Sequence, residues 1–165
     1  MLSNGAVSLP SVRGMHMAEQ PESAAATEPA PVGPDQGPAK PFFYSVAELP
    51  SQSMAEMMDA SGAGDEEKQK MFDLFGRDLV TTTILVSPAL SVFHEVAKPG
   101  EKVKPHRHGT HQITYVLRGS LRYGNRETTA GMGYFSPDKN YSWTAGDEGA
   151  EWLEIHAGLP QIVAG

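Results

Sequence analysis

The second half of the chain consists of short apolar segments separated by turn-forming residues. Eight segments of strand length follow Asp78, with Gly, Pro, Asn and Asp between them: LVTTTILV, LSVFHEVA, KVKPHRH, HQITYVL, SLRYG, MGYFS, NYSWTA and EWLEIHA. No helical pattern interrupts this series. We therefore predict an all-β fold, in which a closed or sandwiched antiparallel sheet surrounds one core.

The segment before these strands, residues 41–78, has a different pattern. It opens with FFYSVAELP, whose aromatic and apolar residues suit packing against a sheet, and continues with GDEEKQKMFDLFG. Asp65, Glu66 and Glu67 favour the first turn of a helix, and Gly76 is a suitable end for it. We expect a short helical lead-in that covers one open end or face of the domain and could act as a lid over a cavity.

Residues 1–40 are rich in Ala, Pro, Ser, Glu and Gly and show no apolar period. Such a composition cannot bury enough apolar surface to offset the entropy cost of ordering the chain. We predict a disordered N-terminal tail over residues 1–40. The remaining residues, 41–165, form a single folded domain that includes the helical lead-in.

Composition narrows the class of protein further. The net charge is −7 and there is no cluster of Lys and Arg, which argues against a nucleic-acid surface. Cysteine is absent, so disulfides and thiolate chemistry are excluded. No apolar run approaches the ~20 residues of a membrane-spanning helix, and the first residues do not form a signal peptide. We expect a cytoplasmic location and no membrane partner.

Candidate metal ligands lie close together in the sequence. His106 and His108 alternate in a segment with strand character, so both imidazoles face one side of a sheet. Gln112 follows a Gly-Thr break, where the chain can turn back toward them. Three neutral donors would then converge on one point.

The spacing of Gly100, His106, His108, Gln112 and Gly119 resembles the first sequence motif of the cupin family, with Gln where most metal-binding members carry Glu. This resemblance implies a double-stranded β-helix, the cupin jelly roll. It also implies a divalent metal ion, such as Fe, Mn, Ni or Zn, held by the two histidines and Gln112. An uncharged amide ligand would leave the ion a stronger Lewis acid.

The second cupin motif matches less well. Gly131 and Pro137 are at the expected positions, but Ser142 stands where the fourth ligand, a histidine, is expected. His156 and His94 could replace that ligand, although each could instead be a solvent-facing residue of a half-buried strand. His156 is included in the predicted ligand set.

Two further residues are candidates for catalysis. Glu154 shares a strand face with His156, and a carboxylate buried beside a metal can act as a general base. Tyr141 could act as an acid or base if its phenol points inward, although strand aromatics usually serve packing. His111 should face the opposite side from Gln112, at the surface or a dimer interface.

Two functional hypotheses follow from these patterns. The first is a metal-dependent cupin enzyme, of the dioxygenase or the lyase and isomerase type, that acts on a small oxygen-bearing organic acid, ketone or aromatic compound. The second is a cupin that binds a small ligand without catalysis, with weakly bound metal or none, as the missing second-motif histidine suggests. The resemblance also implies a homodimer, to which the apolar FFYSV segment could contribute.

Overall fold

The computed structural model describes residues 41–165, so the predicted tail over residues 1–40 lies outside the described residues. Within 41–165 the strands are β1 (Ser51–Ser53), β2 (Val80–Val86), β3 (Ser91–Ala97), β4 (Lys102–Arg107), β5 (His111–Tyr123), β6 (Arg126–Thr129), β7 (Gly133–Pro137), β8 (Tyr141–His156) and β9 (Val163–Ala164). The helices are a 3₁₀ turn at Val46–Glu48, α1 (Met54–Ala60) and α2 (Asp65–Phe75).

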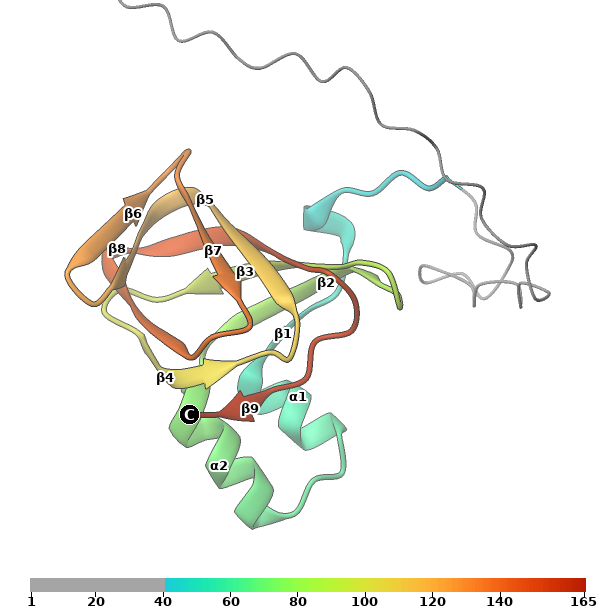
Figure 1. Cartoon of the computed structure of the whole chain (residues 1–165). Coiled ribbons are helices and arrows are strands. Elements are labelled where there is room, and N and C mark those ends of the chain that lie inside the picture. Colours follow the sequence, from blue (N-terminus) through green and yellow to red (C-terminus); the bar gives the residue numbers. More distant parts are fainter. Residues whose placement is uncertain (1–40) are drawn as a thin grey trace, which may run out of the picture.

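The strands form one antiparallel sheet that curls around an interior (Figure 1). Two long strands connect its halves. The end of β8, residues 150–156, pairs with β3 and β5, whereas its start pairs with β4 and again with β5. Because β8 lies between three partners along its length, residues of β3, β4 and β5 all face the same interior. The predicted all-β jelly roll, the double-stranded β-helix, is confirmed.

Two pairs of predicted strands are continuous in the structure. HQITYVL and SLRYG join in β5, and NYSWTA and EWLEIHA join in β8, because the expected breaks are irregularities in the pairing. At Gly119 the φ angle is 66°, and an added Cβ would collide with the backbone carbonyl of Gly149. Glycine is therefore required where these two strands cross closely. Strands β1, β6 and β9 were not predicted.

The predicted helix is confirmed as α2, which ends at Gly76. The sequence analysis missed α1, although Ser53 and Glu56 form a capping box at its start. Met54 of α1 and Phe75 of α2 belong to the buried core, and both helices lie at one open end of the roll (Figure 1). The lead-in therefore covers an end of the domain, as expected.

The aromatic residues before α1 do not pack as expected. Phe42, Phe43 and Tyr44 are exposed, with relative accessibilities of 41%, 102% and 54%. They border a groove along β2 instead of filling a core position. The core combines residues of the roll, such as Trp143 and Trp152, with Met54 and Phe75 of the helices.

Candidate metal centre

The six residues that the sequence singles out for catalysis or metal binding all lie inside the roll: His106, His108, Gln112, Tyr141 and His156 are buried, and the Glu154 side chain is 12% exposed. The strand pairing explains why they meet. β8 places Tyr141 opposite His106 of β4 and places His156 opposite Gln112 of β5. Residues far apart in the sequence are thus brought to one place by a single long strand.

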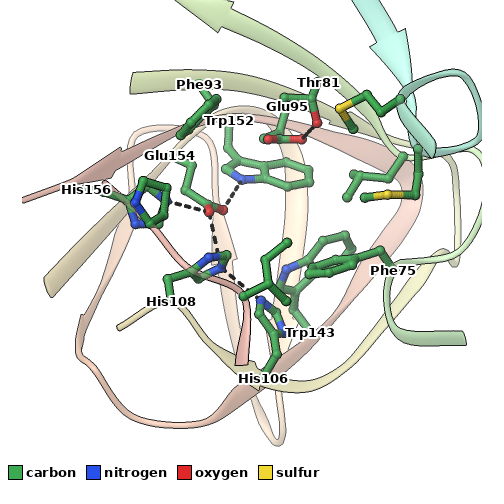
Figure 2. A pocket seen from close by; sticks show the side chains of 15 residues that line it. Phe75, Thr81, Phe93, Glu95, His106, His108, Trp143, Trp152, Glu154 and His156 are labelled. Atoms are coloured by element: carbon green, nitrogen blue, oxygen red, sulfur yellow. Dashed lines mark hydrogen bonds and ion pairs between the residues drawn. The ribbon is translucent and has the colours of Figure 1, made fainter. Parts of the chain in front are cut away.

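Three imidazoles and one carboxylate point toward one another at this place (Figure 2). The Nε2 atoms of His106 and His108 are 3.1 Å apart. A carboxylate oxygen of Glu154, Oε1, lies 2.9 Å from Nε2 of His156 and 3.5 Å from Nε2 of His108. We refer to these four residues as the histidine–glutamate cluster. His108, Glu154 and His156 each offer one ligand atom within 4.8 Å of the others.

The cluster contains more acceptor atoms than protons. Nδ1 of His106 donates to the carbonyl of Lys104, 2.9 Å away, so the Nε2 atom of the neutral ring carries a lone pair. That lone pair, the phenol oxygen of Tyr141 and the Glu154 carboxylate all surround Nε2 of His108, which carries at most one proton. A cation would satisfy the surplus lone pairs, and imidazole with carboxylate suits divalent Zn, Fe, Mn or Ni.

Contacts behind the rings also suit metal binding for two of the three histidines. A metal-binding imidazole usually donates its other N–H to a neighbouring acceptor. His106 does so to Lys104, and the Thr110 hydroxyl, 3.1 Å from Nδ1 of His156, can accept or donate as required. Nδ1 of His108 is buried without a hydrogen-bond partner among the described residues.

Gln112 has a different set of contacts from the one expected of a ligand. Its amide oxygen accepts a hydrogen bond of 2.9 Å from the Tyr141 hydroxyl, and its amide nitrogen donates to Thr114. Gln112 therefore holds Tyr141 in place, and Tyr141 contacts His108 in turn. Glu154 instead supplies a carboxylate oxygen, which lies 2.9 Å from Nε2 of His156 and 3.5 Å from Nε2 of His108. The cluster thus carries a negative charge that a ligand set with Gln112 would lack.

The electrostatics of the cluster favour an ionised Glu154 carboxylate beside neutral imidazoles at His106 and His108. Burial lowers the pKa of His108 to about 4 and also lowers the pKa of His106. Burial acts to raise the pKa of Glu154, but the hydrogen bond from His156 and the surrounding imidazoles outweigh it and hold that pKa below its usual value. Neutral imidazoles and a carboxylate are the protonation states that bind metal.

The remaining sequence candidates lie elsewhere. Ser142 is on the outer side of β8, where it borders a shallow hollow with Lys102 and Arg122, while Tyr141 takes the inward position. The alternative prediction that His156 and His94 face solvent is wrong. His156 is 1% exposed within the cluster, and His94 is buried against Glu151, 2.9 Å away. His111 is exposed, as expected.

The cluster forms part of the wall of a cavity of about 190 Å³. Most of the remaining wall is apolar, and it comes from both helices, the inner face of the roll and the C-terminal segment: Met54, Met57, Phe75, Leu79, Phe93, Trp143, Trp152, Pro160 and Ile162. Thr81 and Glu95 complete it. Glu95 was not predicted as a site residue. The one feature of the sequence that could have identified it is a charged residue at an inward position of a strand.

Comparisons with solved structures give matches of low sequence identity. The chain is similar to KdgF from Halomonas sp. (19% identity, TM-score 0.46, 48% of this chain and 78% of the other) and to an RmlC-like cupin from Shewanella frigidimarina (18%, 0.44, 48% and 76%). It is also similar to the polyketide cyclase RemF from Streptomyces resistomycificus (17%, 0.44, 52% and 70%). No protein-family model and no curated protein matches the chain.

These identities and TM-scores are too low to transfer an activity. The class is defined instead by the strand pairing together with the first motif. The chain has the cupin fold, and its histidine–glutamate cluster lies in the interior of the roll. In residues 41–165, no helix is both long and apolar enough to cross a membrane.

Proposed function

We propose that the protein is a metal-dependent cupin enzyme that acts on a small oxygen-bearing organic substrate, by dioxygenase or by lyase and isomerase chemistry. The observation that carries this proposal is the convergence of His108, His156 and the Glu154 carboxylate, with His106 beside His108, on the wall of a cavity. Buried groups of this kind cost folding free energy unless they are paired or bind a ligand. A divalent ion bound there supplies Lewis acidity and, for a redox-active metal, electron transfer.

The chain's own residues have distinct tasks in this proposal. His106, His108 and His156 hold the ion together with Glu154, and Gln112 fixes the hydroxyl of Tyr141 beside them. Burial raises the pKa of Tyr141 far above its usual value, so its phenol stays protonated and keeps the hydrogen bond that it donates to Gln112. Glu154 is ionised and can also accept a proton from a bound substrate. The apolar walls exclude water from these groups.

Metal analysis of the purified protein tests the proposal. We expect about one divalent ion per chain in protein prepared without an affinity tag, and loss of most of it in His106→Ala and His156→Ala, because each variant removes a ligand. His111→Ala is the matched control, since His111 is exposed and outside the cluster. Elemental analysis after exhaustive dialysis gives the metal content.

The alternative, a cupin that binds a small ligand without catalysis, is favoured by the position of Ser142, which leaves the second motif without its inward histidine. If the wild-type protein is purified without metal and does not bind added Zn²⁺, Mn²⁺, Fe²⁺ or Ni²⁺, this result would contradict the enzyme proposal and support the alternative. Retention of metal in both cluster variants would contradict the ligand assignment.

A further inference from the structure

One ionisable group in the cavity plays no part in the histidine–glutamate cluster. Glu95 lies on β3 with its side chain turned inward, and only 8% of the residue is exposed. It is paired with Thr81 of β2 on one side and with Trp152 of β8 on the other. An apolar residue would be expected at such a position, because burying a carboxyl group costs folding free energy.

The contacts of Glu95 leave part of its carboxyl group available to a ligand. The Thr81 hydroxyl donates to one oxygen, Oε2, at 2.8 Å. Among the described residues the other oxygen, Oε1, has no hydrogen-bond partner, and Glu95 and Thr81 both line the cavity. Burial, with the Glu154 carboxylate nearby, raises the pKa of Glu95 well above its usual value and favours the neutral acid. A neutral carboxyl group can donate or accept a hydrogen bond.

Glu95 and the imidazoles of His106 and His108 line different parts of one apolar cavity (Figure 2), and the Glu154 carboxylate lies close enough to Glu95 to raise its pKa. Glu95 and Thr81 lie on the side away from His106 and His108, and aromatic rings surround the space between. The rings of Trp143 and Trp152 meet edge to face, with their centroids 5.0 Å apart. A bound molecule therefore meets polar groups at two ends and aromatic walls around its middle.

Size and charge limit what fits. An apolar cavity of about 150 Å³ accommodates benzene, so a cavity of about 190 Å³ accommodates one ring with small substituents. The lining contains neither Lys nor Arg among the described residues, so it offers no side-chain cation to a multiply charged anion. Aromatic walls favour a ring.

We propose that Glu95, held by Thr81, selects the substrate of this cavity as a neutral ring compound that carries a second hydrogen-bonding oxygen at its end remote from His106 and His108. This inference rests on the proposed function for the site and narrows its substrate class. Within the organic acids, ketones and aromatic compounds expected from the sequence, it favours an uncharged aromatic ketone or alcohol over a di- or tricarboxylic acid.

Two probes of nearly equal shape test the inference: 4-hydroxyacetophenone, which has an oxygen at both ends, and 4-ethylphenol, which lacks the second oxygen. Calorimetric titration of the full-length protein measures each affinity. We expect the wild type to prefer 4-hydroxyacetophenone by roughly tenfold or more, because an unpaired buried carboxyl group penalises the analogue. The chain's two tryptophans, Trp143 and Trp152, both line the cavity, so quenching of their fluorescence locates the bound probe.

Substitutions at the anchor distinguish recognition from folding. Glu95→Leu should reduce the preference to within about threefold, because it removes the hydrogen-bonding group while keeping an apolar wall. Glu95→Gln should retain the preference, since an amide of similar size donates and accepts. Thr81→Val should weaken it by releasing the carboxyl group. Circular dichroism establishes that each variant is folded.

Two results would overturn the inference: an undiminished preference in Glu95→Leu, or a wild type that binds neither probe. Metal content measured on the same samples separates this inference from the proposed function. Loss of Glu95 should leave bound metal unchanged, because Glu95 is outside the cluster. A metal-free protein that still prefers 4-hydroxyacetophenone would contradict the enzyme proposal and leave the role of Glu95 intact.

Discussion

At the scale of single residues, the two inward carboxyl groups of the roll have opposite electrostatic environments. Glu154 is surrounded by imidazoles that lower its pKa, whereas burial without a cationic partner raises the pKa of Glu95. Pairs of titratable groups whose pKa values are shifted in opposite directions are typical of functional sites. The same contrast makes a testable statement about stability, because a carboxyl group with a raised pKa changes how folding depends on pH.

Glu95→Gln should stabilise the protein near neutral pH. In the unfolded chain Glu95 ionises near pH 4.5, whereas in the folded protein it stays protonated to higher pH. Since the unfolded state then binds fewer protons, the wild type loses stability as the pH rises above that value. The amide variant has no such loss, so its melting temperature should exceed that of the wild type at pH 7. The difference should close below about pH 4.5.

Thermal unfolding followed by circular dichroism across this pH range measures the difference. Glu154→Gln serves as a contrast, because its pKa is lowered and its ionised form is the one that the folded state favours. We expect that variant to be less stable than the wild type at pH 7. A Glu95→Gln variant that matches the wild type at every pH would contradict the electrostatic assignment of Glu95.

At the scale of elements, the sequence predicts the strands well because they have period-two patterns and turn residues between them. It could not predict that β5 and β8 are continuous, since a bulge at Gly119 resembles a turn when no partner strand is known. The contact set of Gln112 depends on Tyr141, which lies 29 residues further along the chain. Local spacing therefore identified the buried site residues but not which atoms meet.

The capping box of α1 should control how firmly this helix covers the cavity. The Ser53 hydroxyl accepts from the Glu56 amide, and the Glu56 carboxylate accepts from Ser53 in return. Met54 and Met57 of the helix line the cavity. Ser53→Ala should destabilise α1 by about 1 kcal/mol, because a backbone donor at the helix start loses its partner.

Hydrogen exchange measured by mass spectrometry on peptides from residues 54–60 detects this change. Exchange there should accelerate about fivefold in Ser53→Ala, as about 1 kcal/mol implies, with strands β5 and β8 unaffected. Ser45→Ala is the matched control, because Ser45 precedes the 3₁₀ turn without making a side-chain cap. Equal protection from hydrogen exchange in both variants would show that the capping box does not stabilise α1 over the cavity.

At the scale of the whole molecule, one outer face of the roll is apolar. A row of paired residues crosses five strands from β2 to β7: Leu85, Val92, Ile155, Ile113 and Phe135. Ile113 and Phe135 are 48% and 56% exposed, and Tyr115 and Leu117 extend the face along β5. Contiguous exposed apolar surface of this kind is typical of protein interfaces. We call it the outer apolar face.

We expect a homodimer that pairs through the outer apolar face, the kind of symmetric contact in which the same patch serves both copies. Light scattering coupled to size-exclusion chromatography gives the mass in solution. Ile113→Lys should shift the protein to a monomer, because burying a lysine of this row in the interface opposes pairing. Phe43→Lys tests the other apolar candidate, the FFYSV segment, at a fully exposed residue. Dissociation only in Phe43→Lys would move the interface to that segment, and a monomeric wild type would exclude the dimer altogether.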